Sequence, residues 1–247
     1  MAVEVMLLLL AGGAAMLSKK KGGRAGGTKG ACPSPKEAEG FLVGYKFRHE
    51  MIGGANPTDR VPVIVYFHAR GVEPNIPRSF PSVNLPARVI MPFANKTNDK
   101  GNPIWFQGRA ADADQEALAK EMAAQAPPME AFLSAVRQCY PGAPLILTGY
   151  SQGGMMTLLM GSWGLSDALV PVSAWLPREL WPDQPIFPPM NAVHGASDMT
   201  IPSDRSRAMY EEFSRAGNSV HASFIAEQEG HGTKLLPWSA TLNRTLS

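Results

Sequence analysis

The stretch LILTGYSQGGMMTLLM, residues 145–160, decides the fold of this chain. Apolar runs suited to burial stand on both sides of a Gly-x-Ser-x-Gly group made by Gly149, Ser151 and Gly153. Glycine is unfavourable inside a strand or a helix, so this group marks a bend that the rest of the molecule must require. The sequence therefore predicts a buried strand, a tight turn at Ser151 and a helix that begins directly after it.

The segments around this stretch alternate between strand-like and helical patterns. The expected strands cover residues 40–52, 61–71, 86–94, 143–151, 168–177, 188–198 and 219–231. Helical spacing covers residues 112–140, with a break at Pro127 and Pro128, and residues 152–164 and 203–217. Such alternation predicts an α/β fold, with a mostly parallel central sheet and helices on both faces.

Charge is distributed unevenly along the 247 residues. Of 23 basic and 21 acidic side chains, six basic and three acidic lie in residues 1–40, which leaves 17 and 18 in the remainder. A nearly neutral body lacks the concentrated basic face that phosphate binding needs, so nucleic acid is not expected as a partner.

The first residues differ in composition from the rest of the chain. Residues 5–17 form an apolar stretch of signal-peptide length, and residues 19–35 form a basic, glycine-rich linker. Glu4 precedes the apolar stretch and lysines follow it, a charge order typical of a short anchor. We expect residues 1–38 to be a signal or membrane anchor, or else an unstructured extension of a cytoplasmic protein, and residues 39–247 to be one α/β domain. Membrane contact is expected through this segment only, and the oligomeric state is left open.

The two cysteines, Cys32 and Cys139, are too few for a disulfide framework and lack the paired spacing of a zinc site. Two unrelated thiols are the favoured interpretation, and a single bridge in an oxidising compartment is the alternative.

A serine exposed on a strand-to-helix turn needs a histidine to take its proton and a carboxylate to orient that histidine. Asp198 and His231 follow Ser151 in the chain order expected for this kind of turn, and each stands at the end of a predicted strand. Parallel strands deliver their carboxyl ends to one sheet edge, so Ser151, Asp198 and His231 are predicted to form a catalytic triad.

The triad has rival candidates. Asp204 lies six residues beyond Asp198, but the surrounding SDRSR resembles the start of a helix. His194 and His221 fall within predicted strands and are expected to be structural, and His49, in an early strand, is expected to pack in the core or lie on the surface.

The residues YFHARG, at the end of the second predicted strand, are expected to form the loop that faces the developing oxyanion. The two predicted donors are the backbone N–H groups of Gln152 and Arg70. His68 is expected to shape this loop by hydrogen bonding, with a direct role as general base as the less favoured alternative.

With these residues, the chain resembles the phospholipase/carboxylesterase branch of the α/β-hydrolase superfamily, which includes acyl-protein thioesterases. The resemblance covers residues 61–247 and rests on FHARG, WF, GYSQGG, SAWLP, HGASDMTIP and EGHG. Ala69 replaces the first glycine of the family's usual His-Gly-x-Gly loop, and Arg70 holds the position whose backbone N–H is the usual oxyanion donor. The basic N-terminal extension is not a family feature.

The resemblance implies hydrolysis of a small-molecule carboxylic ester or thioester through an acyl-enzyme, with no metal and no organic cofactor. The weak candidates for substrate binding are side chains that either line an apolar acyl pocket or belong to the core, together with the loop histidine: His68, Trp105, Phe106, Met155, Trp175 and Leu176.

Two other functions are compatible with the same scaffold. One is peptide cleavage or dienelactone-type ring opening, although the second usually employs a cysteine nucleophile. The other is a non-catalytic binding protein tethered by its N-terminus. Covalent labelling by a fluorophosphonate would distinguish the enzyme from the binding protein, because only an activated serine reacts with this reagent.

Overall fold

The computed structural model describes residue 32 and residues 38–77, 82–111, 114–183, 186–226, 230–234 and 236–247. The predicted signal or anchor at residues 5–17 lies outside these ranges. No helix among the residues described combines the length and the apolarity needed to cross a bilayer.

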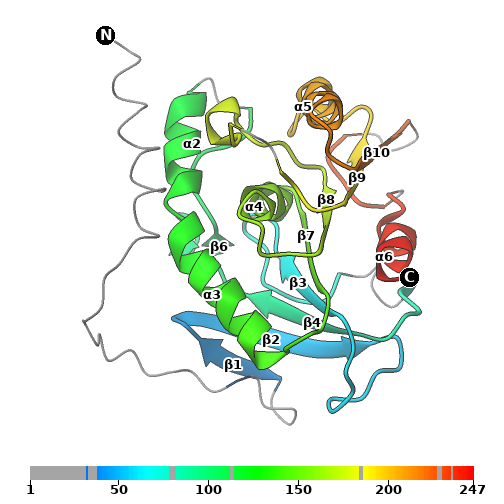
Figure 1. The fold of residues 1–247 in the computed structure, drawn as a ribbon. Coiled ribbons are helices and arrows are strands. Elements are labelled where there is room, and N and C mark those ends of the chain that lie inside the picture. The colour runs from blue at the N-terminus through cyan, green and yellow to red at the C-terminus, as the bar shows by residue number, and fades with distance from the viewer. Residues whose placement is uncertain are drawn as a thin grey trace.

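A twisted eight-stranded sheet runs through the centre of the molecule (Figure 1), in the order β1-β2-β4-β3-β7-β8-β9-β10. The first two pairings, β1 with β2 and β2 with β4, are antiparallel, and all the others are parallel. The strands are β1 Glu39–Leu42, β2 Tyr45–Ile52, β3 Val63–Phe67, β4 Ala87–Pro92, β7 Leu145–Tyr150, β8 Ala168–Val172, β9 Met190–Gly195 and β10 Val220–Ile225. A separate ribbon pairs β5 Lys96–Thr97 with β6 Pro103–Ile104.

Helices cover both faces of the sheet, as predicted. Along β3, Val63, Val65 and Phe67 pack on one face, and Ile64 and Tyr66 pack on the other. The first face carries α2 Gln115–Ala123, α3 Ala126–Cys139, α4 Gln152–Gly161 and α5 Ser203–Arg215, and the second carries α6 Trp238–Leu246 (Figure 1). A short 3-10 turn, η3 Arg178–Leu180, precedes β9.

The predicted strand at residues 40–52 is a hairpin in the structure. Val43 and Gly44 both have positive φ, 46° and 79°, and form a two-residue turn between β1 and β2. Such turns match the twist of antiparallel strands and normally use glycine or asparagine at both positions. Because valine occupies the first position, the sequence pattern did not indicate a turn, and one continuous strand was predicted.

Cys32 and Cys139 form a disulfide, with Cα atoms 5.4 Å apart. The favoured interpretation of two unrelated thiols is therefore corrected. The bond joins the end of α3 to a residue 107 positions earlier in the chain. Pairing over such a distance depends on the three-dimensional fold, which no local sequence pattern reveals.

The loops that carry the predicted site residues leave the same edge of the sheet. His68 follows β3, Ser151 follows β7, Asp198 follows β9 and His231 follows β10. These four strands are parallel, so their carboxyl ends bring the loops together.

Candidate active site

Ser151 occupies a strained turn between β7 and α4, with φ 59° and ψ −122°. A residue with a Cβ rarely adopts positive φ, and such strain persists only where the surrounding structure enforces it. Here the Ser151 N–H donates to the carbonyl of Val172 on the neighbouring strand, at 3.0 Å. The turn thereby fixes the hydroxyl at the carboxyl edge of the sheet.

The glycines beside Ser151 are required by close backbone approach. A Cβ at Gly149 would lie 2.4 Å from the carbonyl oxygen of Gly153, and a Cβ at Gly153 would lie 2.0 Å from that of Phe67. At Gly154 a Cβ would lie 2.7 Å from the carbonyl oxygen of Val172. Helix α4 therefore starts directly against β3 and β8, and this contact explains the bend in the sequence.

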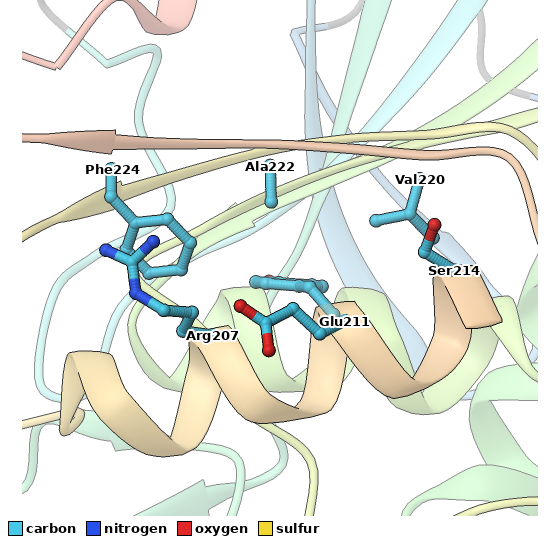
Figure 2. Close-up of a pocket in the computed structure, with 7 residues that line it drawn as sticks. Arg207, Glu211, Ser214, Val220, Ala222 and Phe224 are labelled. Atoms are coloured by element: carbon cyan, nitrogen blue, oxygen red, sulfur yellow. The ribbon is translucent and has the colours of Figure 1, made fainter.

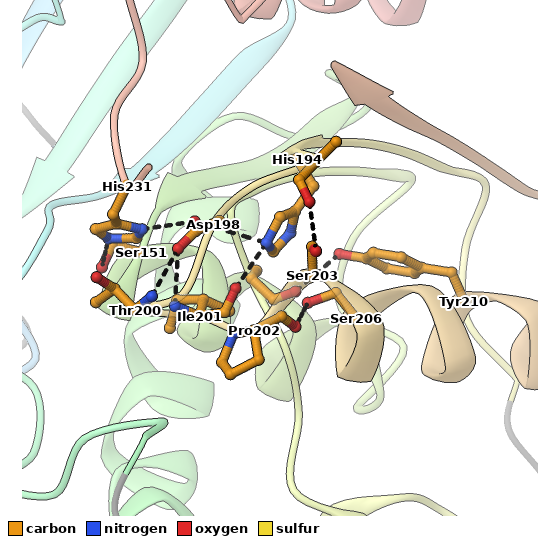
Figure 3. Close-up of polar contacts among 12 residues, drawn as sticks. Ser151, His194, Asp198, Thr200, Ile201, Pro202, Ser203, Ser206, Tyr210 and His231 are labelled. Atoms are coloured by element: carbon orange, nitrogen blue, oxygen red, sulfur yellow. Dashed lines mark hydrogen bonds and ion pairs between the residues drawn. The ribbon is translucent and has the colours of Figure 1, made fainter. Parts of the chain in front are cut away.

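Ser151, His231 and Asp198 form one continuous chain of hydrogen bonds (Figure 3). His231 Nε2 lies 2.8 Å from Ser151 Oγ, and His231 Nδ1 lies 2.7 Å from Asp198 Oδ2. A carboxylate oxygen only accepts, so Nδ1 carries the ring proton and Nε2 is left to accept the serine hydroxyl. This tautomer is the one that can take a proton from Ser151.

Asp198 is completely buried, at 0% exposure. Its Oδ1 accepts the N–H groups of Thr200 at 2.9 Å and Ile201 at 3.0 Å. Burial acts to raise the pKa of Asp198, but the hydrogen bonds from His231 and from the Ile201 N–H outweigh it and hold this pKa below its usual value. The carboxylate is therefore ionised when His231 needs a partner.

Gln152 takes part in the site through both its backbone and its side chain. As the first residue of α4, it has an N–H that no intrahelical carbonyl can accept, at the positive end of the helix dipole. Its side chain accepts the Trp105 N–H at 2.8 Å and donates to the Phe106 carbonyl at 2.6 Å. The sequence pointed only to the backbone N–H, and the side chain also ties the loop after β6 to the serine turn.

Arg70 holds the same loop from the other side. Its Nη1 donates to the carbonyl oxygens of Phe106 and Gln107, at 2.8 and 2.9 Å. The Arg70 side chain therefore anchors the loop after β6.

His68 is a neutral, buried support of the loop after β3. Its Nε2 accepts the Ala94 N–H at 3.1 Å, so its Nδ1 carries the proton and donates to the Ala69 carbonyl at 2.8 Å. The ring stacks on Trp105, with centroids 4.9 Å apart. Burial lowers the pKa of His68 to about 4. These contacts match the shaping role and leave no free nitrogen for a general base.

The predicted substrate-binding residues lie mostly in the core. Exposure is 1% or less for His68, Trp105, Phe106, Met155 and Leu176. These side chains fill the space between the sheet and the helices, which is the core placement that the sequence left as the alternative. Their contact with a substrate stays a prediction. Trp175, at 8% exposure, lines a groove of about 360 Å³ beside η3 and α5, together with Trp181 and Met209.

A second groove, of about 210 Å³, lies between α5 and β10 (Figure 2). Arg207, Glu211 and Phe224 line it, with the Arg207 guanidinium 3.9 Å from the centroid of the Phe224 ring. It contains none of the residues predicted for the site.

The rival triad candidates lie apart from the hydrogen-bonded chain. Asp204 is exposed in the first turn of α5, His221 is exposed on β10, and His49 is buried on β2. His194 is buried behind Asp198. Within the ranges described, no group of three or more His, Cys, Asp or Glu side chains could hold a metal ion.

Residues 76–234 match the sequence family described as Phospholipase/Carboxylesterase. No curated protein sequence matches the chain. Among solved structures, esterase PE8 is similar with a TM-score of 0.66 and 19% identity, over 81% of this chain and 97% of its own. The Bacillus cereus carboxylesterase gives 0.60 and 18%, over 81% and 91%, and Zea mays acyl-protein thioesterase 2 gives 0.57 and 19%, over 81% and 97%. At these identities the likeness establishes the fold.

Proposed function

Because the chain belongs to the phospholipase/carboxylesterase family and has the α/β-hydrolase fold, we propose that it hydrolyses carboxylic esters or thioesters with Ser151 as the nucleophile. The observation that carries the proposal is the unbroken chain of hydrogen bonds from Ser151 through His231 to Asp198. It ends on a serine whose strained backbone lies at the carboxyl edge of a parallel sheet, where this fold places a nucleophile elbow.

In the first half of the proposed reaction, Ser151 Oγ attacks the acyl carbon while His231 Nε2 takes the hydroxyl proton. The protonated ring is stabilised by Asp198, which accepts from Nδ1. The backbone N–H groups of Gln152 and Arg70 are the proposed donors to the oxyanion of the tetrahedral intermediate. When this intermediate collapses, the leaving alcohol or thiol receives the proton from His231, and the acyl group remains on Ser151.

In the second half, water enters and His231 Nε2 takes a proton from it as it attacks the acyl-enzyme. Collapse of the second intermediate releases a carboxylic acid and returns the proton to Ser151. Every proton moves between Ser151, His231, water and the leaving group. This acyl transfer needs no metal or organic cofactor, so a small ester or thioester and water are the proposed reactants.

The direct test is Ser151→Ala, assayed on a short p-nitrophenyl ester and on an acyl thioester. We expect kcat/KM for both to fall on the order of 10⁴-fold, because the nucleophile is lost while the fold is kept. Ser162→Ala, which removes a hydroxyl just after the other end of α4, is the matched control and should leave both rates unchanged.

Labelling by a fluorophosphonate tests the activation of the serine without reference to any substrate. The wild-type protein should gain one adduct on Ser151, found by peptide mass spectrometry, and Ser151→Ala should gain none. Folded wild-type protein that resists labelling would contradict the proposal and favour a binding role.

A further inference from the structure

His194 lies on the side of Asp198 that faces away from Ser151 (Figure 3). It is the fifth residue of β9, and its ring is 1% exposed. Its Nε2 lies 2.9 Å from the carbonyl oxygen of Ile201 and 3.6 Å from Asp198 Oδ2. Asp198 is therefore bracketed by two imidazoles, with His231 on the open side and His194 in the interior.

The contact with Ile201 fixes the protonation of the His194 ring. A carbonyl oxygen only accepts, so Nε2 carries the proton, and in the neutral ring Nδ1 then has a lone pair. Nδ1 is buried without a hydrogen-bond partner among the residues described. The ring also stacks on Phe224, with centroids 5.7 Å apart. Burial lowers the pKa of His194, in agreement with a neutral ring.

The Ile201 carbonyl belongs to the turn that orients the carboxylate. The N–H of the same residue donates to Asp198 Oδ1 at 3.0 Å, beside the Thr200 N–H at 2.9 Å. Ile201 therefore links the two side chains: its carbonyl accepts from His194, and its N–H donates to Asp198 Oδ1. His194 thus fixes one end of the turn at residues 198–201. With Oδ1 held in this way, Oδ2 is left to face His231.

We propose that His194 is a positioning residue, whose neutral ring fixes the turn at residues 198–201 so that Asp198 Oδ2 stays directed at His231 Nδ1. This inference rests on the proposed function of the serine. The 3.6 Å separation from Oδ2 is too long for a hydrogen bond, so His194 does not compete with His231 for the carboxylate. Its Nε2–H nevertheless presents the positive end of a dipole to the buried negative charge.

Two substitutions separate this role from simple packing. His194→Leu keeps most of the volume and removes the donor, whereas His194→Gln can place an amide N–H near the position of Nε2. With a p-nitrophenyl ester we expect His194→Leu to lower kcat by about 10–100-fold with KM unchanged, an effect of the size seen when the outer partner that orients a metal-ligating side chain is removed. His194→Gln should recover most of the lost kcat.

A matched control is His49→Leu, on β2 and outside the proposed machinery. It replaces another buried histidine whose Nδ1 has no hydrogen-bond partner in the part of the chain that the structure describes. It should leave kcat unchanged. Active-site titration with a fluorophosphonate refers each kcat to folded, competent enzyme. The low-field proton resonance of the His231–Asp198 hydrogen bond gives a second readout, which should weaken or shift in His194→Leu and return in His194→Gln.

Unchanged kcat in His194→Leu, equal losses in the Leu and Gln variants, or an equal loss in His49→Leu would overturn the positioning role. If His194→Leu does not fold, the resonance and kcat of His194→Gln decide, and a Gln variant that folds but lacks both overturns it. Ser151→Ala is run beside these variants. Turnover that survives Ser151→Ala would reject the proposed function itself, whereas a dead Ser151→Ala with a fully active His194→Leu would reject the positioning role alone.

Discussion

The ring of Tyr150 lies against the imidazole of His231, with centroids 5.0 Å apart and planes inclined by 23°. Tyr150 directly precedes Ser151, so the turn that exposes the serine also supplies a flat support for its partner. Burial raises the pKa of Tyr150, and the charge of Asp198 adds to this effect. The phenol therefore remains neutral beside the histidine.

Tyr150→Ala should lower kcat by up to about tenfold, because stacking of this kind contributes roughly 0.5–1.5 kcal/mol and a tenfold change in rate corresponds to about 1.4 kcal/mol. Tyr150→Phe keeps the ring and should keep the rate. Steady-state kinetics with a p-nitrophenyl ester measure both. Equal losses in the two variants would instead assign the effect to the hydroxyl.

The contact between α4 and β3 gives a prediction on stability. Gly153→Ala would put a Cβ 2.0 Å from the Phe67 carbonyl oxygen, where neither backbone can easily move. We expect a loss of about 3 kcal/mol in the free energy of unfolding, measured by urea denaturation.

Gly142→Ala is the control for the glycine contact. Gly142 has a φ of 76°, and no atom of the described residues lies within 4 Å of its ideal Cβ, so alanine there carries only the backbone penalty of about 1–2 kcal/mol. Equal losses in the free energy of unfolding at positions 142 and 153 would mean that the close approach to Phe67 does not require glycine at position 153.

The order of strands and helices could be predicted because each main element has a strong local pattern. The buried strand before Ser151 and the amphipathic helix α5 are examples. The final helix, α6, was not predicted. Its apolar residues, such as Trp238 and Leu242, are few, and it is held by tertiary contacts: the Trp238 indole donates to Thr148 Oγ1 on the central strand at 3.0 Å.

The relation between Ser151, Asp198 and His231 could be anticipated because all three follow parallel strands. The supporting contacts could not. Stacking of Tyr150 on His231 and the grip of His194 on Ile201 depend on side-chain directions across different strands. No short sequence pattern records such directions, so His194 looked like any buried strand residue.

The disulfide between Cys32 and Cys139 predicts a difference between oxidised and reduced protein. A cross-link stabilises mainly by restricting the unfolded chain, and typical values are about 2–4 kcal/mol. Reduction should lower the urea midpoint accordingly, and so should Cys139→Ser. Cys32→Ser should cost the same, and the double variant no more than either single one. A midpoint insensitive to reduction would show that the bond does not contribute to stability.

His68 predicts a loss of stability in mild acid. Burial lowers the pKa of His68 from 6.5 to about 4, so above pH 6.5 the ring is neutral in both the folded and the unfolded chain. Between these values the unfolded chain binds a proton that the folded chain excludes, and stability falls as the pH is lowered. The free energy of unfolding lost in this way amounts to about 3 kcal/mol, and the loss is complete below the pKa of the folded state. Urea denaturation at a series of pH values measures it.

The variant His68→Gln isolates the contribution of this ring, because it retains an acceptor for the Ala94 N–H but does not titrate. It should be less stable near neutrality, and its free energy of unfolding should fall less steeply as the pH is lowered. Since burial also lowers the pKa of His49 and His194, some decline remains in the variant, and the difference between the two curves isolates His68. Parallel curves for wild type and variant would mean that His68 is protonated in the folded protein as readily as in the unfolded chain, and its role as a neutral support of the loop would fail.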